Sequence, residues 1–268
     1  MAGKYASGAR VLCIMRKEYA LCAAGKINGK KKMTGKKPPK PPGTSGNPRG
    51  LQKKVRVKTR AKRSISSARW LERQLNDPYV AAAKTEGYHS RAAFKLLEMN
   101  DDLDIFKPGM KVVDLGAAPG GWTQVVCNIV KPGANGGKVV AIDYLEMKPV
   151  AEAEFFQMDF TDDEAPDVLK NAIGGKAHVV MSDMAPPTMG HKQTDHIRIM
   201  ALAEMAYDFA KDILLPEGVF LAKVFQGGTE QDFLNQLKRD FVKVKHIKRP
   251  ASRADSSEMY VVAIGFRG

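Results

Sequence analysis

The pattern of hydrophobic and polar positions divides the chain near residue 63. Residues 1–62 are rich in Lys, Gly and Pro, with KKPPKPPGTSGNPRG at their centre, whereas regular periodicity begins at about Ser66. A segment of this composition buries too little apolar surface to offset the entropy lost on ordering. We therefore expect residues 1–62 to be a disordered arm and residues 63–268 to form a single domain.

Two helices are predicted at the start of that domain. The segments SSARWLERQL (residues 66–75) and SRAAFKLLEMND (residues 90–101) both place apolar residues at helical spacing. Ser90 is the expected N-cap of the second helix, because Ser is a preferred residue at that position.

After Pro108 and Gly109 the pattern changes to short apolar runs that alternate with helical stretches. The runs that predict strands are KVVDL, GKVVAID, AEFFQM, AHVVMSD, GVFLAKVF, VKVKHI and MYVVAIGF, with helical stretches around residues 122–130, 162–173, 195–214 and 229–240. Alternation at this spacing predicts an α/β fold, with a mostly parallel sheet covered by helices on both faces. Functional sites in such sheets lie at the carboxyl ends of the strands.

The first strand runs into the turn GAAPGGW at residues 116–122, which is similar to the dinucleotide fingerprint G-x-G-x-x-G. Ala118 stands where that fingerprint has its middle glycine, and Pro119 lacks a backbone donor. Both changes disfavour a bound pyrophosphate, and with it a nicotinamide dehydrogenase. A nucleoside with a short amino-acid tail is still compatible, because Gly116 and Gly121 allow close approach and Asp114 can face an ammonium group.

Two further acidic residues follow the next two strands. Asp143 ends VVAID, where a carboxylate can accept from both hydroxyls of a ribose. Asp159 follows the third strand and could accept from an adenine amino group. A single Asp after a strand is often only a turn residue. Because Asp114, Asp143 and Asp159 follow successive strands, however, the set predicts a site for S-adenosylmethionine.

The run GVFLAKVF contains a lysine among apolar residues. Alternation places Lys223 on the same face as Val219 and Leu221. A lysine there is costly to bury unless it has a partner carboxylate, loses its charge or lies at the mouth of the strand. Asp183, at the end of the fourth strand, is expected at the same edge of the sheet. A lysine that simply reaches solvent remains the alternative.

These motifs together resemble the FtsJ family of RNA ribose 2′-O-methyltransferases, and most closely its members that act on a uridine of bacterial 23S ribosomal RNA. The resemblance runs in order from RWLERQL through VVDLGAAPGGW, MSDMAPPTMGH and LAKVFQG to SSEMYVVAIGF. It implies the class I methyltransferase fold, a seven-stranded Rossmann-like sheet whose last strand is antiparallel. It also implies a catalytic tetrad of Lys95, Asp183, Lys223 and Glu258, and cofactor contacts at Gly120, Trp122, Asp143, Asp159 and Asp183.

The implied tetrad suggests how the reaction proceeds. A ribose 2′-hydroxyl must lose its proton as the methyl group is transferred, and Lys223 is the expected general base. Burial beside a second cation, Lys95, would favour the neutral amine that a base requires. Asp183 and Glu258 are expected to orient the lysines and the ribose. The expected cofactor is S-adenosylmethionine, and no metal is expected.

Other chemistries are disfavoured by particular residues. Methylation of a base amino group usually uses a polar residue before a Pro-Pro-aromatic run, but here Ala185 precedes the two prolines and Thr188 follows them. Methylation of a cytosine carbon needs a cysteine nucleophile, and no Cys follows Cys127. Transfer RNA, a messenger RNA cap and mitochondrial ribosomal RNA stay open as substrates of the same chemistry. A non-catalytic RNA-binding factor in ribosome assembly also stays open.

The net charge of +14 is concentrated in the N-terminal quarter. Residues 1–69 contain 20 Lys and Arg against one acid, Glu18, whereas residues 70–268 contain 23 basic and 28 acidic residues. The basic arm therefore predicts binding to a polyanion, which could be RNA, DNA or an anionic membrane, although a solubilising segment remains the alternative. The resemblance implies large-subunit ribosomal RNA as the partner. KRDFVKVKHIKRPASR is a second candidate for phosphate contacts, although a sheet with one solvated face explains its pattern equally well.

The remaining composition bears on location and assembly. Three cysteines without metal-ligand spacing, and no apolar run of the ~18 residues that a membrane helix needs, predict a protein with reduced thiols and no membrane span. We expect a cytoplasmic monomer, with a mitochondrial location as the minor alternative. Met33 begins a run that could be an alternative start of translation.

Overall fold

The structure, a computed structural model, describes residues 64–187, 189–225, 231–253 and 256–268. All of them belong to the compact unit Lys40–Gly268. The basic arm predicted over residues 1–62 lies outside the described residues, so its disorder and its binding to a polyanion stay predictions.

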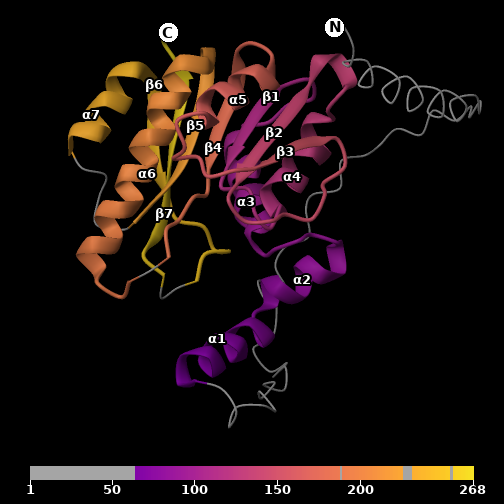
Figure 1. The fold of residues 1–268 in the computed structure, drawn as a ribbon, viewed down its shortest axis with the longest axis vertical. Helices are drawn as coiled ribbons and strands as arrows, with labels where there is room; N and C mark the ends of the chain where they lie inside the picture. The colour runs from indigo at the N-terminus through magenta and orange to yellow at the C-terminus, as the bar shows by residue number, and fades with distance from the viewer. Residues whose placement is uncertain (1–63, 188, 226–230, 254–255) are drawn as a thin grey trace, which may run out of the picture. The chain divides into compact units, whose positions relative to one another are not determined.

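Seven strands form one sheet in the order β3-β2-β1-β4-β5-β7-β6 (Figure 1). They are β1 (Lys111–Leu115), β2 (Lys138–Asp143), β3 (Ala153–Gln157), β4 (Ala177–Ser182), β5 (Leu214–Phe225), β6 (Phe241–Ile247) and β7 (Glu258–Phe266). The first five pair in parallel, and β7 is antiparallel to both β5 and β6. The predicted seven-stranded, mostly parallel sheet with an antiparallel last strand is confirmed.

Helices cover both faces of this sheet (Figure 1). The helices are α1 (Ile65–Leu75), α2 (Pro78–Glu86), α3 (Ala92–Leu103), α4 (Gly121–Val130), α5 (Ala165–Ile173), α6 (Lys192–Ile213) and α7 (Gln231–Asp240), with a short 3-10 helix at Ala134–Gly136. Side chains alternate along each strand, so that Val112 packs with α3 and α4 whereas Val113 packs with α5 and α6. This two-sided burial explains why the strands read as continuous apolar runs.

Helix α3 begins later than the sequence suggested, and the predicted cap at Ser90 was wrong. Arg91 is the N-cap, and it makes no side-chain capping hydrogen bond. The Ser90 hydroxyl is buried and has no hydrogen-bond partner among the described residues. Ser90 instead packs against Gly121 of α4, where an added Cβ would lie 2.3 Å from the Ser90 Oγ. Packing against α4, rather than a side-chain cap, thus accompanies the start of α3.

A cluster of aromatic rings joins α6 and α7 to β5 and β6. The ring of Tyr207 lies 5.5 Å from that of Phe220, 5.6 Å from Phe233 and 6.2 Å from Phe241, measured between centroids. The Tyr207 hydroxyl donates to the carboxylate of Asp240 at the end of α7. Ring packing and one hydrogen bond therefore both hold this half of the molecule together.

Substitutions at Tyr207 should separate these two contributions. Tyr207→Phe keeps the ring and removes the hydrogen bond, so it should lower the free energy of unfolding by about 1 kcal/mol. Tyr207→Ala leaves a cavity and should lower it by about 3–5 kcal/mol. Urea denaturation of both variants measures the difference. Equal losses in the two variants would show that the ring contributes little.

Candidate active site

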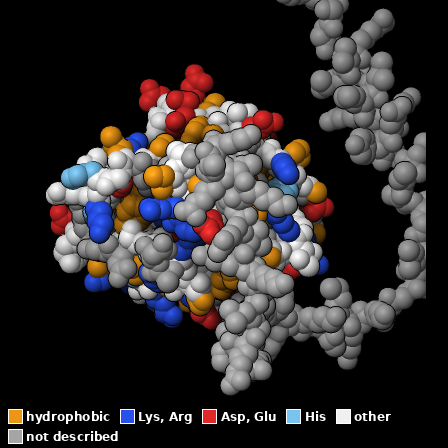
Figure 2. Space-filling view, turned by 90° about the horizontal axis from the view of Figure 1, so that it is seen from below, with side chains coloured by type: hydrophobic (Ala, Val, Ile, Leu, Met, Phe, Trp, Pro, Cys, Tyr) orange, Lys and Arg blue, Asp and Glu red, His pale blue; other side chains and the backbone are white. Residues whose placement is uncertain are grey.

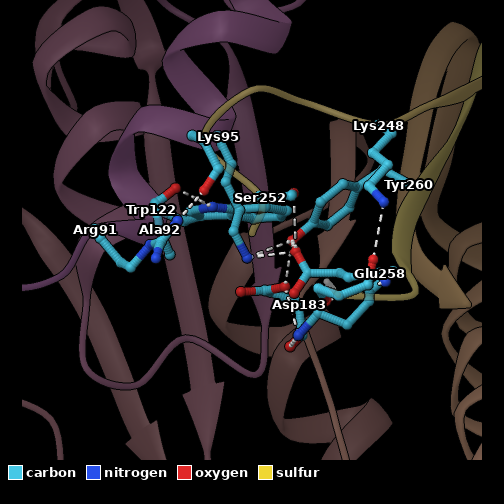
Figure 3. Close-up of polar contacts among 12 residues, drawn as sticks. Arg91, Ala92, Lys95, Trp122, Asp183, Lys248, Ser252, Glu258 and Tyr260 are labelled. Atoms are coloured by element: carbon cyan, nitrogen blue, oxygen red, sulfur yellow. Dashed lines mark hydrogen bonds and ion pairs between the residues drawn. The ribbon is translucent and has the colours of Figure 1, made fainter. Parts of the chain in front are cut away.

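Four charged side chains from distant parts of the chain meet at the carboxyl edge of the sheet (Figure 3). Lys223 Nζ lies 2.7 Å from Asp183 Oδ1 and donates to the Asp183 carbonyl at 2.8 Å. Lys95 Nζ forms an ion pair with Glu258 Oε1. None of the four side chains is more than 18% exposed. The structure thus brings together all four residues of the tetrad that the resemblance implied.

Each lysine of the tetrad has its own carboxylate. Burial alone would raise the pKa of Glu258, but the charges of Lys95 and Lys223 and the hydrogen bonds to its carboxylate outweigh burial and lower that pKa. Glu258 is therefore held ionised beside both lysines. The expected orienting role of the two carboxylates agrees with this geometry. Lys95 itself is paired with Glu258 and not placed as an uncompensated cation.

Tyr260 links the two ion pairs, and sequence reasoning missed it. Its hydroxyl lies 2.9 Å from Asp183 Oδ1, 2.8 Å from Glu258 Oε1 and 3.3 Å from Lys95 Nζ (Figure 3). Because a phenol has one proton, it donates to one carboxylate at a time. Burial, reinforced by Asp183 and Glu258, raises the pKa of Tyr260 well above its usual value, so the phenol stays protonated. Its place two residues after Glu258, on the same face of a strand, was the available signal.

A cavity of about 670 Å³ opens beside Asp183 and Lys223. It lies beyond the carboxyl ends of β1, β2 and β4, where the strand order changes direction. The predicted site residues that line it are Gly116, Asp143, Asp159, Asp183 and Lys223, and Ala118 joins them. Its volume lies within the range usual for small-molecule sites.

Backbone hydrogen bonds hold the two acids on the far side of this cavity. Asp143 accepts from the N–H of Ala118 at 2.9 Å and from that of Leu145 at 2.8 Å, one bond on each oxygen. Asp159 Oδ1 accepts from the N–H and the hydroxyl of Thr161 at 2.9 and 2.8 Å. Both acids therefore act as turn residues and also face the cavity. A carboxylate has about four acceptor sites, so each can still accept from a ligand.

The glycines of the turn make room for neighbouring parts of the protein. Gly116 has a φ of +78°, and a Cβ there would lie 2.7 to 2.8 Å from atoms of Met184. Gly120 has a φ of +101°, and a Cβ there would lie 2.8 Å from His89 Nδ1. Both positions lie in the left-handed region, which favours glycine. These glycines therefore leave room for Met184 and His89, and whether a cofactor also approaches them closely stays a prediction.

Trp122, Gly120 and Asp114 do not line the cavity. The Trp122 side chain is 2% exposed, donates to the carbonyl of Ala92 at 2.9 Å and packs 5.4 Å from the ring of Tyr260. It therefore ties α4 to α3 and to Tyr260. A contact between this residue and a cofactor stays a prediction.

Asp114 is a fully buried carboxyl at the end of β1. Its Oδ2 accepts from the Thr123 hydroxyl at 2.7 Å, whereas its Oδ1 has no hydrogen-bond partner among the described residues. Burial is the main cause that raises the pKa of Asp114 to about 7, and the charges of Asp183 and Asp143 add to it. A buried carboxylate oxygen without a donor is costly. Since Asp114 does not line the cavity, the predicted contact between this carboxyl and an ammonium group stays a prediction.

Two further properties concern the whole described part of the chain. Across residues 64–268, apart from the three short gaps, no group of three or more His, Cys, Asp and Glu side chains could hold a metal ion. None of the helices described there has both the length and the apolar character of a membrane span.

Comparison with known proteins gives consistent matches. The family model for FtsJ-like methyltransferase matches residues 88–266. Ribosomal RNA large subunit methyltransferase E of Azorhizobium caulinodans is 59% identical over 215 residues, 80% of this chain and 90% of that protein. The protein of the same name in Parvibaculum lavamentivorans is 58% identical over 233 residues, 84% and 91% of the two chains.

A solved structure also has a similar fold. A Plasmodium falciparum protein, provisionally named a ribosomal RNA methyltransferase, superposes with a TM-score of 0.60 at 26% identity. The match covers 68% of this chain and 100% of that one. The similarity therefore extends over the whole of that protein.

Asp114→Asn should stabilise the ligand-free protein at pH 8. The folded state raises the pKa of this carboxyl from 3.8 to about 7, so it retains a proton that the unfolded chain releases between those values. The free energy of unfolding of the parent therefore falls as the pH rises through this range. At ~1.36 kcal/mol per pKa unit, ionisation costs about 4 kcal/mol at pH 8. Asn at this position can still accept from Thr123.

Urea denaturation at pH 5 and pH 8 measures this effect. The gain from Asp114→Asn should be larger at pH 8 than at pH 5. Asp208→Asn, on an acid whose side chain is 70% exposed, is the control for the loss of one negative charge. Parallel pH profiles of the parent and Asp114→Asn would contradict the prediction.

Proposed function

The chain belongs to the FtsJ-like methyltransferase family, and on that premise we propose that it methylates the ribose 2′-hydroxyl of a uridine in 23S ribosomal RNA, with S-adenosylmethionine as donor. The names of the relatives, which are more than 50% identical, support large-subunit ribosomal RNA as the substrate class. The observation that carries the reaction is the Lys223–Asp183 ion pair on the wall of the cavity, joined to Lys95–Glu258 through Tyr260.

The residues around the cavity fit S-adenosylmethionine. Asp143, at the end of β2, would accept from the ribose hydroxyls, and Asp159 would accept from the adenine amino group. Asp114 does not line the cavity, so a contact between its unpaired Oδ1 and the ammonium group of the amino-acid tail stays a prediction. When bound, the cofactor supplies a methyl group on a positively charged sulfur, which is ready for transfer to an oxygen nucleophile.

The protein's own part in the reaction is to hold the ribose and to accept one proton. Lys223 Nζ, on the cavity wall, would take the proton of the 2′-hydroxyl as the oxygen attacks the methyl carbon. It can accept this proton only as the neutral amine. Asp183 orients Lys223 directly, and Tyr260 with the Lys95–Glu258 pair orients Asp183.

The two lysine–carboxylate pairs also bear on the rival functions. A non-catalytic assembly factor has no use for two lysine–carboxylate pairs in a largely buried position, where removing charges from water is costly. Transfer RNA, a messenger RNA cap or mitochondrial ribosomal RNA would use the same residues, and the names of the relatives support large-subunit ribosomal RNA instead. We extend the proposal to a monomer that acts on the large subunit in the cytoplasm.

Lys223→Ala should lower kcat by a factor of ~10² to 10⁴, the usual contribution of a general base. The affinity for S-adenosylmethionine should change little. Tritiated cofactor is incubated with large ribosomal subunits from cells that lack the enzyme, and separately with free ribosomal RNA, transfer RNA and capped RNA. Label in alkali-resistant dinucleotides identifies a ribose 2′-O-methyl group, because the methyl group blocks alkaline cleavage of the adjacent phosphodiester. The control is Lys170→Ala, a surface lysine paired with Asp212.

The outcomes separate the alternatives. Label on transfer RNA or capped RNA, with none on ribosomal RNA, would retain the reaction and change the substrate. Cofactor binding without label on any RNA would leave a non-catalytic RNA-binding protein. Full activity of Lys223→Ala would contradict the role of this lysine as the base.

A further inference from the structure

A second cavity, of about 330 Å³, lies on the other side of the tetrad from the cofactor cavity, and each cavity is lined by two of the four tetrad residues. Asp183 and Lys223 line the cofactor cavity, whereas Lys95 and Glu258 line the second cavity. The other residues around the second cavity are Arg73, Gln74, Arg91, Arg253 and Ser256. The ion pairs joined by Tyr260 thus connect two cavities of different character.

The second cavity is strongly basic. Four of its lining residues are cations, Arg73, Arg91, Lys95 and Arg253, and Glu258 is the one acid among them. Figure 2, which looks at the molecule from below Figure 1, shows Lys and Arg side chains gathered near the middle of this face around an acidic one. A small cavity with this balance of charge selects an anion.

Asp77 organises two of these arginines. Its side chain is 8% exposed, it caps α2 through the N–H of Tyr79, and its Oδ2 pairs with Arg91 and, at 3.5 Å, with Arg253 Nε. Arg91 also donates to the carbonyl of Ala251. One carboxylate therefore holds two guanidinium groups in fixed positions, and one positive charge is left uncompensated in this trio.

Arg253 provides a second, independent observation that points to a ligand in this cavity. Its Nη2 atom is buried and has no hydrogen-bond partner among the described residues. A buried donor without an acceptor costs about 1–3 kcal/mol, so it is rarely left in a protein without a reason. An anion in the cavity would offer the acceptor that this nitrogen lacks.

We propose that the second cavity binds the phosphodiester on the 3′ side of the target nucleotide, with Arg91 and Arg253 as its ligands and Asp77 as their positioning residue. This inference rests on the proposed function. In RNA the 2′-hydroxyl and the 3′-phosphate are carried by adjacent ribose carbons. A ribose whose 2′-hydroxyl faces Lys223 therefore has its 3′-phosphate only a few bonds away, and the basic cavity beside Lys95 and Glu258 is within this short reach of the tetrad.

The assignment gives a reason why both proposed ligands of the phosphate, Arg91 and Arg253, are arginines. Guanidinium groups match phosphate oxygens with paired N–H donors, so they fix the orientation of the backbone as well as its charge. Such contacts position RNA without reading its sequence. The cavity would thus set which way the strand runs past the tetrad.

Arg253→Ala tests whether Arg253 binds the phosphate. The KM for RNA should rise at least tenfold, with a smaller change in kcat and none in the KM for S-adenosylmethionine. The slope of log KM against log salt concentration should become shallower by ~0.7–0.9, the loss of one phosphate contact. Arg253→Lys should restore part of the affinity. Lys170→Ala, which removes a cation from α5, is the matched control and should change nothing.

Asp77→Asn tests the positioning role. Asn remains a good helix N-cap, so α2 is preserved. Both guanidinium groups lose their carboxylate, and the KM for RNA should rise while the salt slope stays as in the parent, because no cation has been removed. An unchanged KM would overturn this role. If Arg253→Ala has the same salt slope and the same KM for RNA as the parent, the proposed phosphate site is overturned.

A competition experiment identifies which phosphate is bound. Uridine 3′-monophosphate should inhibit methyl transfer more strongly than uridine 5′-monophosphate, and Arg253→Ala should abolish the difference. Equal inhibition, or stronger inhibition by the 5′ isomer, would overturn the assignment. If no RNA is methylated at all, the proposed function fails. Calorimetric binding of the two nucleotides to the protein with S-adenosylhomocysteine then still decides whether the phosphate site exists.

Discussion

The burial of two lysines at one edge of the sheet is the constraint on which the site depends. A buried ammonium group is tolerated only with a partner, and the partners of Lys95 and Lys223 come from β7 and from the end of β4. The Lys95–Glu258 pair cannot form until β7 has inserted antiparallel beside β5, where Tyr260 lies opposite Lys223. The Lys223–Asp183 pair in turn requires β5 to lie beside β4. Assembly of the sheet and assembly of the catalytic cluster are therefore one event.

The two cavities on either side of that cluster are built by different means. The cofactor cavity uses carboxylates that backbone N–H groups hold at strand ends, as with Asp143. The second cavity uses guanidinium groups that a buried carboxylate, Asp77, holds in place. Acceptors thus line the cavity proposed for a ligand rich in hydroxyl and amino groups, and donors line the cavity proposed for a phosphate. The chemistry of each ligand is complemented by residues of the opposite hydrogen-bonding character.

Much of the fold could be predicted from the sequence, because apolar runs and helical stretches respond to burial on one or two faces. Helix α2 was missed, since its short Ala-rich segment has little amphipathic pattern, although Asp77 and Pro78 signal its start. The tetrad was reached through resemblance, because Lys95 alone reads as an ordinary residue of a helix surface. Which lysine pairs with which carboxylate, and the bridging place of Tyr260, depend on contacts between distant segments. No local pattern encodes these contacts.

The single hydrogen of the Tyr260 hydroxyl has a consequence for communication between the cavities. Asp183 and Glu258 compete for it at 2.9 and 2.8 Å, so the network has two nearly equivalent arrangements. A ligand that donates to Asp183 from the cofactor side would favour donation of this hydrogen to Glu258. An anion in the second cavity would favour the same arrangement, because the hydrogen offsets negative charge at Glu258. Such an exchange makes the binding free energies on the two sides interdependent, and thermodynamic linkage requires that the influence be equal in both directions. The hydroxyl of Tyr260, with one proton and two possible acceptors, thus couples ligand binding in one cavity to ligand binding in the other.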